Sequence, residues 1–434
     1  MPLTQQKLSQ SIKSYLAHAG RLSIILPLLA GSLAQAGVER DQARRIHDRL
    51  AGTPPTNAVL TQMESAIVNN ETFNGGTGLE AAAQIAMTNP NFYNVTLKNY
   101  AAPWTNEDQT AFIPLNDYTA TVVGMIRDDK DFREVLSGNI IYTGSNVVST
   151  GYSVSSNLHY EELEALGPVA GDLSDSSILV ERVQSDVNNL PADATAGVVT
   201  TRAAAQAFFS DGTNRAMFRF TLMNHLCTDL EPLKDVSRVP DRVRQDVSRS
   251  PGGDSRIFMF SCVGCHAGMD GLNGAYAKYN FDTVSNSLVY ARTDAAALAD
   301  TSLNGFVAGG ITAKYVNNAE NFSPGYITTD DSWVNYWRVG PNSLLGWDAA
   351  ASNNPLDARG HATGNGAKSM GAELANSRAF ASCQVKKAFK AVCLHNPDDY
   401  AADRSIVDSI TNNFIGTGYN MKTVFAKVAS YCSN

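Results

Sequence analysis

Cysteine, histidine and long apolar runs are all scarce in this chain of 434 residues, which holds 6 Cys and 7 His. After residue 36 no apolar run approaches the about 20 residues that span a bilayer, so we expect no transmembrane segment in the mature chain. The sequence has no G-x-S-x-G motif, no phosphate-binding glycine loop and no H-E-x-x-H motif, so the common signatures of several enzyme classes are missing. The net charge is −8, which gives no electrostatic reason to bind nucleic acid.

The first 36 residues predict an export signal that is cleaved after Ala36. Three basic and no acidic side chains precede the apolar run LSIILPLLAGSL, and the small residues Ala-Gln-Ala follow it. A membrane anchor is the alternative, but the run is too short to cross about 30 Å of hydrocarbon and Pro27 interrupts it. Loss of the three basic residues makes the mature net charge −11. We therefore expect the protein in the periplasm, or exported to the outer membrane surface or the extracellular space.

The mature chain predicts a mainly α fold with an irregular, short-β insertion. Residues 37–160 repeat apolar side chains at steps of three and four and predict an N-terminal helical domain, with an extended stretch near residues 139–154. Residues 161–282 predict helices that lead into a cysteine motif. Residues 283–355 are rich in Gly, Asn and Thr and have short strand-like pieces, and residues 356–434 return to helix.

The stretch FMFSCVGCHAGMD, residues 258–270, places Cys262, Cys265 and His266 within five positions. In a chain of this composition C-x-x-C-H arises by chance on the order of 0.001 times. A redox dithiol would open a helix after a strand, whereas here a helical pattern precedes the motif. A zinc site needs a second ligand pair at short spacing, and a disulfide would leave His266 without a role.

Attachment of a c-type haem uses all three residues of this motif. Two thioether bonds, from Cys262 and Cys265, hold the porphyrin, and His266 supplies the proximal iron ligand. Export favours this interpretation, because bacteria attach c-type haem outside the cytoplasmic membrane. The sequence thus predicts one covalent haem c, and the redox dithiol, the disulfide and the zinc site remain as alternatives.

Three segments of the chain resemble the planctomycete-type secreted cytochrome c family. AGVVTTRAAAQAFF and RFTLMNHLC are similar to its helical segment ending in Leu-Cys, and SCVGCHAGMDGLNGAYAKYNFD is similar to its haem segment. GAELANSRAFASCQVKKAFKAV is similar to its C-terminal domain with S-x-x-F-x-x-C. The family usually has Asp-Pro-Leu-Gly after the motif, where this chain has Asp-Gly-Leu-Asn at 270–273. The resemblance implies a multi-helix cytochrome c-like haem domain, completed by residues 356–434, with an additional helical subdomain, but it names no reaction.

The four remaining cysteines predict two disulfides, because an even number in an oxidising compartment is typical of paired thiols. Sequence alone allows three pairings, and free buried thiols are the alternative. Cys227 and Cys383 both lie in segments that resemble the family, so the resemblance favours that pair. Cys393 and Cys432 would then tie the C-terminal tail to its own helical unit.

The ligand on the other side of the iron has two candidates. Met370 follows a glycine-rich loop well downstream of the motif, although a core position at the start of a helix is the alternative for it. His361 lies in a loop that looks exposed. Met269 is too close to His266 to reach the opposite haem face, and His225 has the position of a structural residue on a helix. The remaining histidines look like surface residues: His47, His159 and His395.

The stretch DDSWVNYWRVGPNSLLGW gathers three of the four tryptophans of the protein. A haem needs an apolar wall and donors for its propionates, and Trp333, Trp337 and Arg338 are candidates for both tasks. A local aromatic core is the alternative for these residues.

These observations together predict an exported monohaem c-type cytochrome that transfers electrons to and from redox partner proteins, an electron carrier more than a catalyst. One alternative is a haem enzyme of the peroxidase or oxygenase type with an open distal site. Another is a surface interaction protein with a structural haem, which would dock through residues 283–355.

Overall fold

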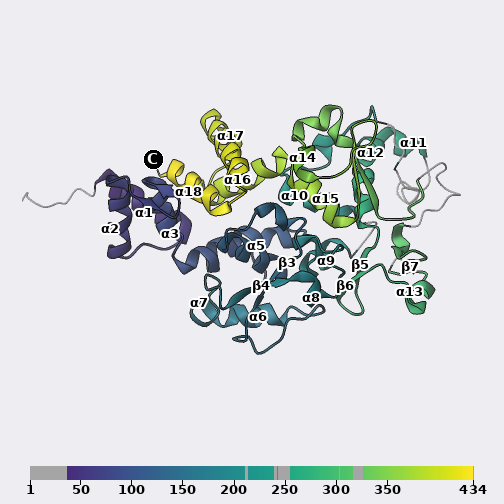
Figure 1. The fold of residues 1–434 in the computed structure, drawn as a ribbon, viewed down its shortest axis with the longest axis horizontal. Coiled ribbons are helices and arrows are strands. Elements are labelled where there is room, and N and C mark those ends of the chain that lie inside the picture. Colours follow the sequence, from purple (N-terminus) through teal and green to yellow (C-terminus); the bar gives the residue numbers. More distant parts are fainter. Residues whose placement is uncertain are drawn as a thin grey trace, which may run out of the picture.

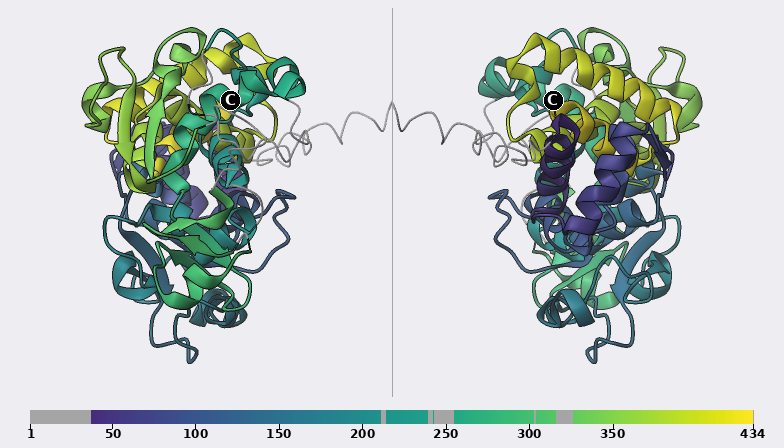
Figure 2. Two further views of the ribbon diagram at one scale, coloured as in Figure 1. Left: turned by 90° about the vertical axis from the view of Figure 1, so that its right-hand side faces the viewer. Right: turned by 90° about the vertical axis from the view of Figure 1, so that its left-hand side faces the viewer.

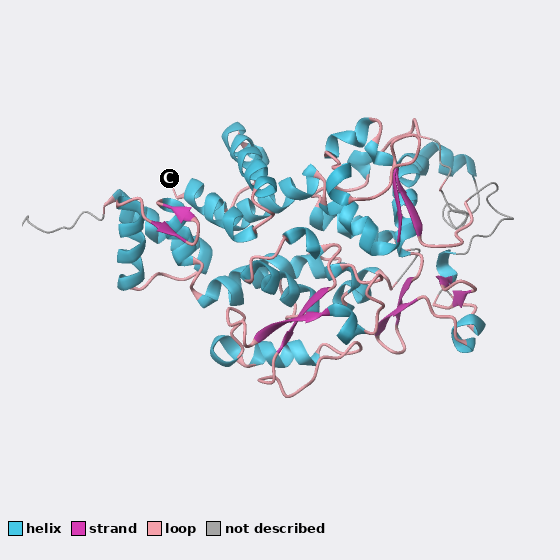
Figure 3. Ribbon diagram, viewed as in Figure 1, coloured by secondary structure: helices cyan, strands magenta, loops and turns pink. Residues whose placement is uncertain are grey.

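The computed structural model describes residues 37–210, 214–238, 242, 255–302, 304–315 and 326–433. The predicted export signal lies outside the described residues. Within them helices dominate, and every sheet is a single antiparallel pair of short strands (Figures 1 and 3). The predicted mainly α fold is therefore confirmed. None of the described helices combines the length and the apolar character that a membrane crossing requires.

Helices from the two ends of the described chain pack side by side. The contacts join α1 to α16 and α18 and join α3 to α18, and α2 packs on α1 and α3 (Figures 1 and 2). The rings of Phe92 and Tyr100 meet Phe425 of α18 edge to face, so aromatic packing closes this unit. The helices of the unit are α1 (Val38–Ala51), α2 (Asn57–Val68), α3 (Leu79–Ala86), α16 (Arg378–Cys393), α17 (Ala401–Gly416) and α18 (Met421–Cys432).

The lower layer in Figure 1 is built around α5, which is buried along its whole length and lies on the pair β3–β4. Asn116 caps α5 by accepting a hydrogen bond from the Thr119 amide. The expected extended stretch contains β3, and β4 pairs with it across residue 160, so parts of two predicted domains form one sheet. The elements of this layer are α4 (Lys98–Ala101), α5 (Asp117–Arg127), β3 (Ile140–Gly144), α6 (Leu158–Ala165), α7 (Gly167–Ala170), β4 (Leu179–Val183), α8 (Gln184–Asn188) and α9 (Arg202–Phe208).

The remaining helices surround the cysteine motif and the segments that follow it. They are α10 (Arg215–His225), α11 (Ser255–Ile257), α12 (Val263–Asn273), α13 (Ala295–Ala299), α14 (Ala349–Ser352) and α15 (Gly366–Ala375). The other strands form antiparallel pairs in the order β1 (Thr72–Phe73) with β2 (Gly76–Thr77), β5 (Tyr279–Asp282) with β6 (Ser287–Tyr290), β7 (Phe306–Val307) with β8 (Ile311–Thr312), and β9 (Ser332–Asn335) with β10 (Ala362–Asn365). The short-β character expected for residues 283–355 thus takes the form of β6, of the hairpin β7–β8, and of β9, which pairs with β10 beyond that segment.

Single helical turns connect many of these elements. Two have π-helical hydrogen bonds, η1 (Phe92–Leu97) and η7 (Phe258–Cys262). The others are 3-10 turns: η2 (Ala102–Thr105), η3 (Phe132–Val135), η4 (Gly197–Thr200), η5 (Glu231–Leu233), η8 (Gly274–Tyr276), η9 (Ala313–Tyr315), η10 (Tyr336–Arg338), η11 (Pro341–Leu345) and η12 (Pro397–Asp399).

Two disulfides join the helices around α16. Cys227, just after α10, is bonded to Cys383 in α16, and Cys393 at the end of α16 is bonded to Cys432 at the end of α18. These are the pairs that the family resemblance favours. The first closes a span of 156 residues, which ties the region of the cysteine motif to the terminal helices.

Two histidines expected at the surface are buried, so that prediction is wrong for His47 and His159. His47 Nδ1 lies 2.7 Å from the Thr53 carbonyl oxygen, and His159 Nδ1 lies 2.6 Å from that of Thr150. The rings satisfy loop carbonyl groups, which local sequence patterns do not reveal. His395 is exposed, as expected.

His225 lies in a buried aromatic cage, in agreement with the structural role expected for it. Its Nε2 shares a hydrogen bond of 2.8 Å with the Tyr118 hydroxyl, and the rings of Trp104 and Phe380 lie against the imidazole. Burial holds the pKa of His225 well below 6.5, and the charge of Lys387 lowers it further. The ring is therefore neutral in the folded protein near neutral pH.

We expect this neutral ring to make the protein acid-sensitive. The unfolded chain binds a proton at His225 below about pH 6.5 while the folded chain does not, so unfolding becomes easier as the pH falls. Relative to His225→Gln, the wild type should lose up to about 1.4 kcal/mol of unfolding free energy per pH unit below that point. Urea unfolding of both proteins at pH 7, 6 and 5 measures this difference. If the free energy of unfolding changes equally with pH in the two proteins, the prediction is contradicted.

Candidate functional site

The cysteine motif lies where η7 passes into α12. Cys262 ends the π-helical turn, and Cys265 and His266 follow in the first turn of α12. Residues three and four positions apart share one face of a helix, so the two thiols and the imidazole project on the same side. All three side chains are partly exposed.

The other face of α12 carries Gly268 and Gly271 and is called the glycine face below. A Cβ at Gly268 would lie 2.1 Å from Nε1 of Trp337, and one at Gly271 would lie 2.8 Å from the Val334 carbonyl oxygen. Both distances are too short for any side chain, so glycine allows β9 and η10 to lie directly against the helix (Figure 1). This contact buries the side of α12 opposite the two thiols and the imidazole.

The imidazole of His266 is held by a buried carboxylate. His266 Nδ1 lies 3.1 Å from Oδ2 of Asp270, one helical turn further on. The side chain of Asp270 is 0% exposed, and both its oxygens accept hydrogen bonds of 2.9 Å from Arg215 of α10. With Nδ1 as the donor to the carboxylate, Nε2 carries the free lone pair. In the described part of the chain, no hydrogen-bond partner of that Nε2 is found.

The two motif cysteines are free thiols and are not bonded to each other. Cys265 Sγ lies 3.8 Å from the carbonyl oxygen of Leu230. Burial raises the pKa of the Cys265 thiol, and the nearby Lys234 only partly offsets this effect. A redox dithiol functions through a lowered thiol pKa, so the environment of Cys265 does not favour that alternative.

Large apolar side chains stand exposed beside the motif. Ile257, Met259 and Phe260, on the turn before Cys262, are 47%, 52% and 89% exposed. Their neighbour Phe258 turns inward and forms a small apolar cluster with Val263 and the helix, and its ring meets His266 edge to face at 5.4 Å. An exposed apolar group of this kind is typical of a surface that a ligand or a partner covers.

The predicted aromatic wall lies beneath the opposite face of α12. Trp333 and Trp337 are buried in the main core, and Trp333 Nε1 donates to the Ser369 hydroxyl. Arg338 forms a nearly buried ion pair of 2.6 Å with Glu373, so its charge already has a partner. The structure thus gives these three residues the packing of a local aromatic core. A role for Trp333, Trp337 and Arg338 in cofactor binding stays a prediction.

The two candidates for the distal ligand are both buried. Met370 is 1% exposed and belongs to the main core in α15. His361 is 5% exposed, so the expectation of an exposed loop residue is wrong for it. Its Nδ1 lies 3.0 Å from Asp357 Oδ2, and its ring packs on Tyr336. Among the described residues no hydrogen bond, ion pair or ring contact joins either candidate to His266, and their roles as ligands stay predictions.

A zinc site at the motif lacks a complete set of ligands in the described structure. Over the described ranges, no three His, Cys, Asp or Glu side chains are grouped so that they could hold a metal ion. A structural zinc ion takes four such ligands. That alternative would therefore need ligands from residues that the structure does not describe.

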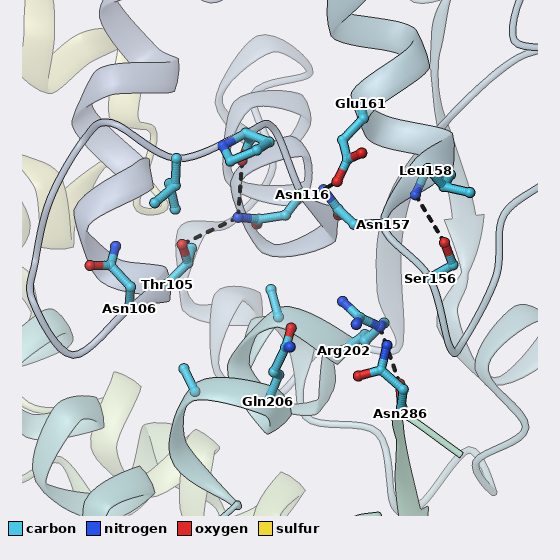
Figure 4. Close-up of a pocket in the computed structure, with 14 residues that line it drawn as sticks. Thr105, Asn106, Asn116, Ser156, Asn157, Leu158, Glu161, Arg202, Gln206 and Asn286 are labelled. Carbon is cyan, nitrogen blue, oxygen red and sulfur yellow. Dashed lines mark hydrogen bonds between the residues drawn. The ribbon is translucent and has the colours of Figure 1, made fainter. Parts of the chain in front are cut away.

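A cavity of about 480 Å³, which the sequence did not identify, lies between the loop before α5 and the start of α9 and is lined by polar and apolar side chains (Figure 4). Many of its polar groups bond to one another. Asn116 donates to the Thr105 hydroxyl, and Arg202 Nε donates to the Asn286 carbonyl oxygen. Neither the motif nor any other predicted site residue lines this cavity.

No family model, no curated protein and no solved structure matches the chain. The resemblance to a cytochrome c family therefore rests on the three sequence segments quoted above. The geometry of the motif does not depend on that resemblance.

Sequence reasoning missed the partner of Asp270. The sequence pointed to this carboxylate only as part of a family pattern, although its place four residues after His266 predicts a contact between them. Arg215 lies 55 residues earlier, and no local pattern connects it to the motif.

We expect the glycine face of α12 to be intolerant of a single methyl group. Gly268→Ala would force a Cβ into the buried Trp337 ring and should lower the free energy of unfolding by about 1–3 kcal/mol. Gly416→Ala, at the end of α17, has open space around it and should be neutral or stabilising by up to about 1 kcal/mol. Urea unfolding measures both, and equal effects of the two substitutions would refute the packing argument.

Proposed function

We propose that the protein is an exported monohaem c-type cytochrome that carries electrons between redox partner proteins. One haem c would be attached through Cys262 and Cys265, with His266 as the proximal iron ligand. The observation that carries the proposal is the geometry of His266. Its imidazole shares a face with two free thiols, and a buried carboxylate holds its Nδ1.

The residues of the motif fit a covalent haem in three respects. The two thiols are free, whereas the other four cysteines of the chain are paired with each other. The thiols and the imidazole lie one helical turn apart on a partly exposed face. The apolar side chains of Met259 and Phe260 stand beside that face and could cover the edge of a flat apolar group.

A bound haem would supply one-electron iron chemistry, with a potential that the axial ligands and their hydrogen bonds set. The protein's own contribution begins at Asp270. This carboxylate accepts the Nδ1 proton of His266 and so reserves Nε2 for the metal. Arg215 holds the carboxylate in place with two hydrogen bonds and balances its charge in the buried site.

Attachment of haem is tested by expression in cells that mature c-type cytochromes. We expect a coloured mature protein that starts after Ala36 and whose mass exceeds that of the polypeptide by one haem. Cys262→Ser with Cys265→Ser should remove the covalent haem, because both thioether bonds are lost. The matched control, Cys393→Ser with Cys432→Ser, removes a disulfide instead and should keep the haem.

A colourless wild-type protein with the mass of bare polypeptide would overturn the proposal.

The spectrum of the reduced haem protein with carbon monoxide separates a carrier from an enzyme. Rapid binding would indicate an open distal site and favour a haem enzyme. A Met–iron band in the oxidised form that is absent in Met370→Leu would assign the distal ligand to Met370.

We expect Asp270 to lower the potential of the iron. Asp270→Asn keeps the shape but removes the charge, so the ferric state is less stabilised and the midpoint potential should rise by about 60 mV or more, a tenfold effect for one electron. Redox titration of the purified proteins measures this shift. Asp403→Asn, which alters a carboxylate 2.9 Å from Nε2 of His395, is the matched control and should leave the potential unchanged. Equal potentials for wild type and Asp270→Asn would exclude this role.

A further inference from the structure

A cavity of about 490 Å³ lies between α16 and the segment that follows α10. It is separate from the motif face and from the cavity in Figure 4. Three lysines of α16 line it, together with apolar side chains of η2 and α10. The lining residues that matter here are Trp104, Met223, Asp229, Lys386, Lys387, Lys390 and Asp398.

The lining of this cavity carries more positive than negative charge. Its two carboxylates already have partners, because Asp398 pairs with Lys386 at 2.8 Å and Asp229 pairs with Arg219 at 2.6 Å. Lys387 and Lys390 have no carboxylate partner among the described residues. Beyond these two pairs the lining carries the amino groups of Lys387 and Lys390, in a chain whose net charge is −8.

Lys387 lies against the aromatic wall of the cavity. It is partly buried, and its Nζ lies 3.9 Å from the centre of the Trp104 ring. Trp104 is 4% exposed and packs edge to face on His225, so the ring is fixed in the wall of the cavity. Burial, and then the charge of Lys390, hold the pKa of Lys387 well below its usual value. An ordinary surface lysine, surrounded by water, would not show this shift.

We propose that this cavity binds a small, singly charged carboxylate with a flat apolar body. The carboxylate would lie at Lys387 and Lys390, where it neutralises the excess charge and restores a partner to a poorly hydrated ammonium group. The apolar body would lie against Pro103 and Met223, which line the cavity and are partly exposed. The size of the cavity falls within the range of small-molecule sites, about 300–1,000 Å³. This proposal does not depend on the haem.

The test uses benzoate as the probe and the mature protein, with isothermal titration calorimetry as the measurement. Benzamide has nearly the same shape but no charge, so it should bind at least tenfold more weakly than benzoate. Lys387→Met should weaken benzoate binding at least tenfold, and Lys387→Arg should retain most of it because the charge is kept. Lys368→Met, which changes a lysine that donates to the Ala192 carbonyl oxygen outside the cavity, is the matched control and should bind as the wild type does.

Proton uptake gives a second readout for the same site. The charged groups around Lys387 are Lys386, Lys390, Asp229 and Asp398, and the buried His225 is neutral near pH 7. A bound carboxylate favours the charged ammonium, so binding above the pKa of free Lys387 takes up a proton, and the affinity falls as the pH rises. Titrations in two cationic buffers of different ionisation heat detect this uptake, which should vanish in Lys387→Met.

Three results would overturn the proposal. They are no saturable benzoate binding by a folded wild-type protein, equal affinity for benzoate and benzamide, and unchanged benzoate affinity in Lys387→Met. The circular dichroism spectrum and unfolding midpoint of each variant establish that it is folded. Because Lys387 has no ion pair among the described residues, we expect Lys387→Met to fold normally.

Discussion

The contact between the glycine face of α12 and Trp337 determines how the candidate site is presented. When one side of a helix is buried, the two thiols and the imidazole on its other side are held in a fixed orientation. Gly268 and Gly271 allow the backbone of β9 and η10 to approach so closely that no other residue fits at those positions. The orientation of the motif is therefore a consequence of packing on the side of the helix that bears no functional group.

A buried carboxylate then orients the imidazole. Removal of a carboxylate from water is unfavourable unless its charge and lone pairs are satisfied, and Asp270 is satisfied by Arg215 and by His266. Because Asp270 is fixed on both sides, the ring of His266 is limited in its rotation and in its tautomer. A metal ligand benefits from this arrangement, because its ring is held in one orientation.

The disulfides place the two proposed sites on connected elements. The bond between Cys227 and Cys383 joins the end of α10 to α16, and the lysine cavity lies beside that bond. From Cys227 the chain runs through Leu230, whose carbonyl oxygen lies close to Cys265. The motif and the cavity are thus joined by a short, covalently anchored segment, although each site is argued from its own contacts.

Much of the fold could be predicted from local patterns, and much of the site could not. The helical class followed from apolar side chains repeated at three and four residues, and the extended stretch with β3 followed from β-branched residues. Predictions of exposure were wrong for His47, His159 and His361, because each ring bonds a nearby loop group and the folded chain covers it. The sequence left open whether Trp333 belongs to a cofactor wall or to a core. The answer depends on which groups pack over its ring.

The sequence by itself determined that Cys262, Cys265 and His266 lie within five positions, and the helix that the structure forms there places them on one face. It also determined that Asp270 follows on the next turn. Only the tertiary structure decided that Arg215 meets that carboxylate, that Trp337 covers the glycine face, and that lysines of α16 enclose a cavity with Trp104. These contacts join residues far apart in the chain, and they arise from burial of whole helices against one another, which no short window of sequence encodes.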